Sequence, residues 1–179
     1  MARQSARARI LEAALAVALR DGAGNLTLDA VAAEAEVSKG GLLYHFPEKQ
    51  ALLSGVLEAA LQRFDGAMDA MMATDPRPGA SVRAYAAATD EPAAALPELF
   101  PALFAASALS PELLQPAREH FARWQARMED DGVDPVTATL VRLAADGLWL
   151  SDAYGLAPIA GERRRQVLER LRNLAGGSS

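Results

Sequence analysis

The side chains best suited to chemistry gather in one short stretch of the chain. It holds hydrogen-bond donors and two glycines, in the order Ser38, Lys39, Gly40, Gly41, Tyr44 and His45. Lys39 can reach a phosphate or a guanine edge, and the glycines leave the backbone bare for a close approach. If Ser38 begins a helix, the free N–H groups and the helix dipole also favour a phosphate there. The stretch therefore indicates contact with a polyanion such as DNA.

Other chemistries are excluded by residues that the chain lacks. It has no cysteine, which removes disulfides, thiolate zinc sites, iron–sulfur clusters and cysteine nucleophiles. His120 has no second histidine and no cluster of carboxylates at ligand spacing, so we expect neither a metal nor another cofactor. The sequence also lacks a recognisable combination of a nucleophile and a general base. The sequence therefore predicts that the protein is not an enzyme.

Composition favours a helical fold. Alanine (40) and leucine (25) supply most of the 51% hydrophobic content of the 179 residues, whereas valine and isoleucine together number 11. Because β-branched residues are the main strand formers, an all-α fold is expected. The net charge of -5 argues against a general polyanion binder but permits a local basic cluster. No apolar run is long enough to span a membrane, so a cytoplasmic protein without membrane contact is expected.

Three short helices are predicted to position the donors. Apolar spacing and the N-caps Thr27 and Ser38 predict them over residues 5–21, 28–35 and 39–45. Their small core is expected to contain Val31, Ala32, Val37, Leu42 and Phe46. A short helix, a turn and a second short helix on a longer one form the helix-turn-helix arrangement, which presents its second helix to the DNA major groove.

The rest of the chain is predicted to be helical as well. Pro47 suits the first turn of a long helix from 48 to about 74, and an alanine-rich helix follows over 81–89. Ser110-Pro111 and Asp134-Pro135 each combine an N-cap with a proline, opening helices of about 20 residues, before a last helix over 162–174. About nine helices are expected in total. The chain is predicted to divide into an N-terminal domain, 1–47, and a larger body, 48–179.

Residues 27–53 resemble the DNA-binding signature of the tetracycline-repressor (TetR) family of transcriptional regulators. They keep the order Thr-Leu, Val-Ala, Ala, Val-Ser-Lys-Gly, Leu, Tyr-His-Phe, Lys and Leu-Leu at the expected spacing. The resemblance implies a homodimer with two N-terminal DNA-reading heads and a helical body that dimerises and often holds a small ligand. Many members carry threonine where this chain has Gly41 and an aromatic where it has Leu43. Base selection is therefore expected to depend on Lys39 and on DNA shape.

The resemblance also implies roles for single residues. Tyr44 and His45 are expected to contact phosphates, and the helix starts at Thr27 and Lys49 to flank the same strand. A basic arm of Arg3, Arg7 and Arg9 can add phosphate or minor-groove contacts. The predicted DNA-contact set is Thr27, Ser38, Lys39, Gly40, Gly41, Leu43, Tyr44, His45, Lys49 and Arg7. The competing interpretation is simple packing for the two rings and solvated charge for the cations.

Aromatic and methionine side chains in the body are candidates for a ligand pocket between helices. The predicted lining is Met68, Met72, Tyr85, Phe100, Phe104, Phe121, Trp124, Asp146 and Trp149. An ordinary hydrophobic core is the alternative. For Asp146 the alternative is an ion pair with Arg142, four residues earlier on one helix. An inward, unpaired Asp146 would instead favour a cationic or hydroxylated effector.

The last two helices are the candidates for a dimer interface, because the family resemblance implies this pairing and their apolar stripes are strong. The predicted contacts are Leu140, Leu143, Ala144, Gly147, Leu148, Val167, Leu168 and Leu171. Arg163, Arg164 and Arg165 are expected to form a solvated rim.

The sequence thus predicts a repressor that binds a palindromic operator, a double-stranded DNA site, as a homodimer and is released by a small-molecule effector. One alternative is a DNA-binding dimer with a fully packed body and no effector. Another is a helical ligand carrier or enzyme in which the three-helix segment is only a scaffold.

Overall fold

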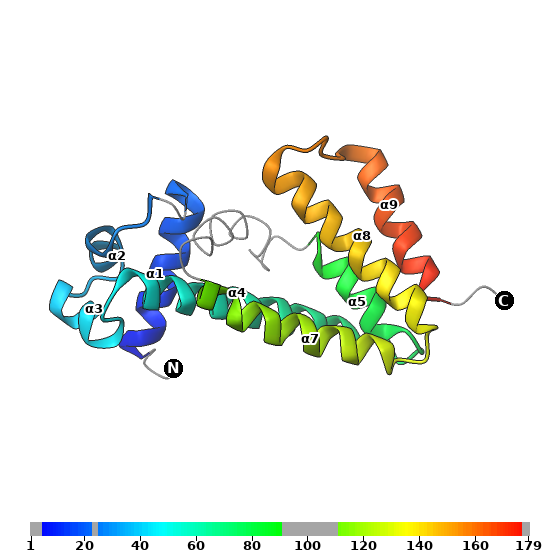
Figure 1. The fold of residues 1–179 in the computed structure, drawn as a ribbon, viewed down its shortest axis with the longest axis horizontal. Helices are drawn as coiled ribbons and strands as arrows, with labels where there is room; N and C mark the ends of the chain where they lie inside the picture. The colour runs from blue at the N-terminus through cyan, green and yellow to red at the C-terminus, as the bar shows by residue number, and fades with distance from the viewer. Residues whose placement is uncertain (1–4, 23–24, 91–110, 177–179) are drawn as a thin grey trace. The chain divides into compact units, whose positions relative to one another are not determined.

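The computed structural model describes residues 5–22, 25–90 and 111–176. Within these ranges it has eight α-helices and no strand, which confirms the predicted all-α fold (Figure 1). The chain forms two compact units. The first takes its described residues from within 1–61 and 98–117, and the second from within 62–97 and 118–179. The division falls inside the long helix α4 (Lys49–Met72).

The first three helices begin at or one residue after their predicted starts, and Thr27 and Ser38 cap two of them as predicted. They are α1 (Ala6–Asp21), α2 (Leu28–Glu34) and α3 (Lys39–His45). The Thr27 hydroxyl accepts a hydrogen bond from the Ala30 N–H at 3.2 Å, and the Ser38 hydroxyl accepts one from the Gly41 N–H at 3.0 Å. Each cap satisfies an N–H that has no partner within its own helix.

Helix α4 begins at Lys49, one residue later than the predicted start at 48, and Pro47 lies outside its first turn. The Leu52 N–H donates to the Glu48 carbonyl, which makes Glu48 the N-cap and leaves Pro47 in the preceding bend. Phe46 is extended, with φ -136° and ψ 91°. A residue before proline is driven out of the helical region, so the chain straightens at Phe46 before α4 can start.

Packing among α1, α2, α3 and the first part of α4 holds the first unit together. Its buried side chains include Ile10, Ala14, Leu15, Leu26, Val31, Ala32, Leu42, Phe46, Leu52 and Val56. A Cβ placed on Gly55 would lie 2.9 Å from Leu11 and 3.0 Å from the Phe46 ring. Helix α4 therefore comes so close to Leu11 of α1 and to Phe46 that only glycine fits at position 55 without a shift of these side chains. Val37 was expected in this core but is only half-buried, because it lies in the turn between α2 and α3.

The second unit contains α5 (Ala80–Ala88), most of α7 (Gln115–Glu129), α8 (Pro135–Tyr154) and α9 (Gly161–Leu174). The sequence predicted a helix from Pro111, but residues Pro111–Leu114 form a 3-10 turn and α7 starts at Gln115. Pro116 explains the difference, because it has no N–H to donate to the carbonyl four residues earlier. Asp134 caps α8 by accepting from the Thr137 N–H at 2.9 Å, as predicted.

Candidate nucleic-acid interface and ligand-binding regions

Helix α3 presents most of the predicted DNA contacts to solvent. Ser38, Lys39, Gly40 and Tyr44 are exposed, while Gly41, Leu43 and His45 are half-buried. Tyr44 is 84% exposed, and its ring touches the edge of His45 with centroids 5.1 Å apart. Leu42, on the opposite side of the same helix, is fully buried. One face of α3 therefore holds the helix in place and the other carries the donors.

The two glycines of α3 differ in their surroundings. A Cβ on Gly40 would meet no atom within 4 Å, whereas one on Gly41 would lie 3.2 Å from the Ser38 hydroxyl oxygen. The fold therefore does not require glycine at position 40. The absence of a side chain there leaves bare backbone beside Lys39 on the exposed face.

An ion pair on this face was missed by the sequence analysis. The Lys39 ammonium lies 2.9 Å from one carboxylate oxygen of Asp29 and 3.1 Å from the other. Asp29 is in the first turn of α2 and Lys39 in the first turn of α3. Ten residues separate them, so no spacing rule within one helix could have found the pair.

The basic arm has separate structural contacts. The Arg9 guanidinium donates to the Ala35 carbonyl at 2.8 Å and also reaches the Glu36 carbonyl. Glu36 has a φ of 52°, so Arg9 fixes the turn between α2 and α3 at its most strained residue. The Arg7 guanidinium lies over the Phe46 ring, 5.3 Å from its centroid. Arg3 lies outside the described residues.

The remaining two predicted contacts flank α3 in the chain. Thr27, at the start of α2, and Lys49, at the start of α4, are both exposed. The structure thus brings helix starts and donors to the surface of the first unit. How these residues meet DNA remains a prediction.

The second unit is built around a cluster of aromatic side chains. Phe64 and Tyr85 contact each other, and each contacts both Trp124 and Trp149, with ring centroids 4.7 to 5.9 Å apart. All four are buried, as is Met68, while Phe121 and Met72 are half-buried. Phe100 and Phe104 lie outside the described residues. The predicted pocket residues that are described thus include most of this cluster.

Asp146 is the acidic group at the edge of the aromatic cluster. Its carboxylate accepts from the Tyr85 hydroxyl at 2.6 Å and pairs with Arg142 at 2.7 Å, so the predicted ion pair within α8 is confirmed. Burial raises the pKa of Asp146, against the lowering effect of its hydrogen bonds to Tyr85 and Arg142. Burial and the neighbouring Asp146 charge raise the pKa of Tyr85 well above 10. Asp146 points inward, but it has partners.

The predicted dimer contacts divide between exposed and buried positions. Leu140, Leu143, Ala144 and Gly147 are exposed on α8. Val167 is half-buried on α9, and Leu148, Leu168 and Leu171 are buried inside the second unit. The last three are buried in a unit where α8 and α9 contact each other and α5. They are therefore covered within one chain.

Helix α8 carries a longer exposed stripe than the sequence analysis identified. Val136, Leu140, Leu143, Leu150 and Tyr154 are all between 46% and 66% exposed, and exposed Gly147 completes the row. Their spacing alternates between four and three residues, the pattern that forms a straight seam along a helix. We call these six residues the α8 stripe.

His120 is buried in the second unit, with its Nδ1 atom 3.0 Å from a carboxylate oxygen of Asp65. Asp65 also accepts the indole N–H of Trp124.

Among residues 5–22, 25–90 and 111–176, no three His, Cys, Asp or Glu side chains gather as metal ligands do. None of the described helices combines the length and apolar character that crossing a membrane requires.

Comparison with solved structures gives several matches along nearly the whole chain. A TetR-family member from Streptomyces coelicolor A3 is 28% identical, with 94% of this chain and 98% of that chain covered and a TM-score of 0.69. The multidrug binding protein EbrR complexed with imidazole is also 28% identical, covering 94% and 96%, with a TM-score of 0.65. EbrR also matches in its complex with malachite green, at 28% identity, 92% and 96% coverage and a TM-score of 0.62. Curated proteins gave no match.

Family profiles match both parts of the sequence. Residues 10–56 match the bacterial regulatory proteins of the TetR family, and residues 79–176 match the tetracyclin repressor-like C-terminal domain. The second match alone spans more than half of the 179 residues. With its capped three-helix segment and its helical body each matched in this way, the chain belongs to the TetR family of DNA-binding transcriptional regulators.

Proposed function

We propose that this regulator is a repressor that binds a palindromic operator as a homodimer and leaves it when a small aromatic effector binds. The observation that carries the proposal is the exposed face of α3, where Tyr44 is 84% exposed beside Lys39 and the open backbone at Gly40. An exposed tyrosine beside a lysine and bare backbone offers a hydroxyl donor that can reach a phosphate. Contact with a partner gives the ring a role.

The chemistry of this face suits the DNA backbone. The capped start of α3 directs N–H groups outward, where helix polarity favours a phosphate. Lys39 can reach a guanine edge or a phosphate, and Tyr44 can donate its hydroxyl to a second phosphate. Asp29 offsets the Lys39 charge in the free protein, so Lys39 exchanges one anionic partner for another when DNA arrives.

The α8 stripe supports the homodimer. Exposed apolar rows of this length are unusual on monomers and are typical of interfaces. Two copies of the stripe related by a twofold axis would bury all six positions, with Gly147 permitting close approach. Two heads joined in this way require an inverted repeat in the DNA, and each head's affinity is multiplied by the effective concentration of the other.

The homodimer is tested by charge introduced into the stripe. Leu143→Glu should convert the dimer into a monomer in sedimentation equilibrium, because a carboxylate would be buried opposite its own copy. Leu19→Glu is the matched control, since Leu19 is also an exposed leucine, on α1 outside the stripe. A Leu143→Glu protein that remains dimeric would remove the stripe from the proposal.

DNA binding is tested by selecting retained sequences from random double-stranded DNA at about 150 mM salt. An inverted repeat should emerge. Lys39→Ala and Tyr44→Ala should each weaken binding to it by about 1–3 kcal/mol. Arg163→Ala removes an exposed cation from α9 and serves as the charge-matched control. Enrichment of no sequence at this salt or at lower salt would contradict the proposal.

The aromatic cluster with Asp146 supports the effector. Flat rings stack on such side chains, and the Tyr85–Asp146–Arg142 network supplies both donors and acceptors at its edge. EbrR was solved with imidazole and with malachite green, both aromatic. The similarity to EbrR suggests that this body takes the same chemical class.

The effector is tested first on the protein alone. Malachite green should quench the tryptophan fluorescence, because both tryptophans of the chain belong to the cluster. Trp149→Phe, which keeps an aromatic ring, should weaken binding less than Trp149→Ala. Addition of the dye should then lower the affinity of the protein for the selected operator. The factor equals the ratio of the dye's affinities for the DNA-free and the DNA-bound protein. Binding that leaves operator affinity unchanged would leave a DNA-binding dimer without this switch.

A further inference from the structure

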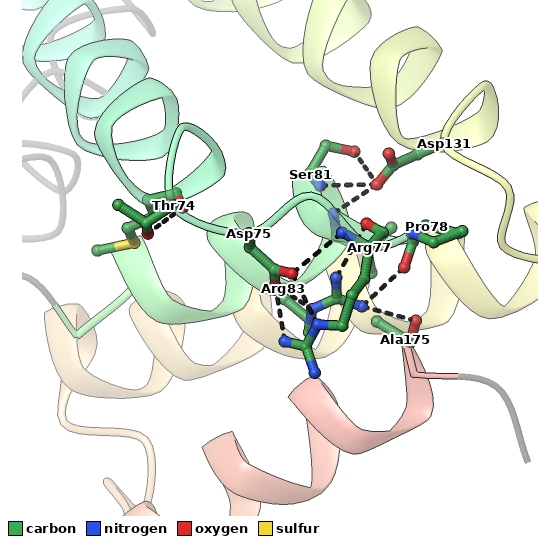
Figure 2. A network of polar contacts seen from close by, with 10 residues as sticks. Thr74, Asp75, Arg77, Pro78, Ser81, Arg83, Asp131 and Ala175 are labelled. Carbon is green, nitrogen blue, oxygen red and sulfur yellow. Dashed lines mark hydrogen bonds and ion pairs between the residues drawn. The ribbon is translucent and has the colours of Figure 1, made fainter.

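The second unit contains a groove that is separate from the aromatic cluster. It has a volume of about 550 Å³ and lies where the end of α4, the turn after it, α5 and α9 meet. Ligand-binding sites typically have volumes of about 300–1,000 Å³. Figure 2 shows the polar side of this region, with Asp75, Arg77 and Arg83 drawn together.

The floor of the groove is apolar because α5 carries small residues there. Ala80, Ala84 and Ala87 line it at spacings of four and three residues, which places them on one helix face. Larger side chains at these positions would fill the space. Met71, at the end of α4, borders the alanines with a flexible apolar side chain.

The wall of the groove is positively charged. Arg77, Arg83 and Arg172 line it, against Asp75 as the acidic lining residue. Asp75 is already neutralised, because it accepts two hydrogen bonds from the Arg77 guanidinium, at 2.7 and 2.9 Å, and one from the Arg83 guanidinium at 2.7 Å. These hydrogen bonds, those of Arg77 foremost, hold the pKa of Asp75 well below its usual range. A cationic wall on a chain of net charge -5 selects for an anion.

The three arginines differ in how many of their side-chain nitrogens already donate hydrogen bonds within the protein. Arg83 also donates to the carbonyls of Pro78, Arg77 and Ala175, so all three of its side-chain nitrogens are engaged and it acts as a fixed frame (Figure 2). Arg77 uses two of its three nitrogens on Asp75 and is largely exposed. Arg172 projects from α9 and is exposed. Arg77 and Arg172 are thus placed to bind an incoming anion.

We propose that this groove binds a small organic carboxylate with an apolar chain. The carboxylate pairs with Arg172 and with the remaining edge of Arg77, and the chain lies over the three alanines and Met71. A guanidinium matches a carboxylate in shape and charge. A linear apolar chain fits the space that the small alanine side chains leave open. This is a second ligand site, distinct in place and in charge preference from the aromatic cluster.

The experiment is calorimetric titration of the full-length protein, without DNA, with carboxylates from hexanoate to dodecanoate below their micellar concentrations. Decanol, acetate and decyltrimethylammonium test the apolar chain, the anion and the opposite charge separately. We expect saturable binding of a medium-chain carboxylate and much weaker binding of these three. Arg172→Gln should weaken carboxylate binding at least about tenfold, the effect of losing one charged hydrogen-bonding partner. Ala87→Phe should abolish it by filling the floor at a half-buried position.

Arg163→Gln is the matched control, because it removes an exposed arginine from α9 outside the groove and should leave the affinity unchanged. Thermal unfolding of each variant checks that the fold is intact. The proposal is overturned if no carboxylate of the series binds, or if decyltrimethylammonium binds as well as decanoate. It is also overturned if Arg172→Gln binds normally while Tyr85→Phe does not, because the ligand would then lie in the aromatic cluster. Operator binding plays no part in the measurement, so this result and that of the operator selection are independent.

Discussion

Two tyrosines show how differently the two units use their polar aromatic side chains. Tyr44, on α3 of the first unit, is 84% exposed. Tyr85, on α5 of the second unit, is fully buried and donates its hydroxyl to Asp146. The first unit presents its donors to solvent, where a partner can meet them. The second unit satisfies its donors internally, so a ligand there has to compete with existing contacts.

Glycine substitutions should give the largest contrast between the units. Gly79 has a φ of +82°, and an added Cβ would lie 2.3 Å from the Ala175 carbonyl oxygen and 2.7 Å from Val133. Gly79→Ala should therefore lower the free energy of unfolding by about 3 kcal/mol or more, measured by urea unfolding with tryptophan fluorescence. Gly40→Ala should preserve or raise stability by up to about 1 kcal/mol, because the position is helical and open.

The same pair of variants should differ in the opposite sense in DNA binding. A methyl group on Gly40 would stand between the α3 backbone and the DNA, so Gly40→Ala should weaken operator affinity while the protein stays folded. A Gly79→Ala protein as stable as wild type would contradict the close packing at the start of α5. A Gly40→Ala protein with full affinity would mean that bare backbone is unnecessary on this face.

Removal of the two tyrosine hydroxyls should produce a smaller contrast. Tyr85→Phe removes the buried hydrogen bond that Asp146 accepts from the Tyr85 hydroxyl, and it should lower folding stability by about 1–3 kcal/mol. Tyr44→Phe should change stability by less than about 0.5 kcal/mol but weaken operator binding, because only the DNA-bound state uses that hydroxyl. Unfolding curves and operator titrations of both variants distinguish these outcomes. Equal stability losses would remove the distinction between the units.

Acid should weaken one ion pair of the second unit. The pKa of Asp75 is depressed mainly by hydrogen bonds from Arg77, so its ionised form stabilises the folded state. That contribution is present above about pH 4, where the unfolded carboxyl is also ionised, and is lost as the pH falls towards the lower folded value. Asp75→Asn should therefore lower the melting temperature at neutral pH, and the difference from wild type should shrink below about pH 4. A constant difference across this range would assign the effect to packing.

Replacement of Asp29, the ion-paired carboxylate of the first unit, should change stability less than replacement of Asp75. Asp29 and Lys39 form an exposed pair, which is worth at most about 1 kcal/mol. Asp29→Asn should leave unfolding unchanged and raise affinity for non-specific DNA by about fivefold at most, because it removes a negative charge beside Lys39. Binding measured over a range of salt checks this. Weaker binding would instead mean that Asp29 positions Lys39.

Features that depend on near neighbours along the chain could be predicted before the fold was known. Thr27, Ser38 and Asp134 cap helices as predicted, since a cap needs only a side-chain oxygen and an N–H two or three residues ahead. The Arg142–Asp146 pair was predictable for the same reason, because residues four apart share a helix face. The family motif in residues 27–53 extended this local information to the fold.

Contacts between side chains and partners distant in the sequence could not be predicted, because they depend on how the helices pack. Arg9 bonds the carbonyls of a turn 26 and 27 residues away, and Leu148, Leu168 and Leu171 belong to the interior of one chain. Spacing shows that a helix has an apolar face, but not which of its residues another helix covers. The groove beside Arg172 likewise depends on α9 lying against α5, a contact between segments about 90 residues apart that no local pattern specifies.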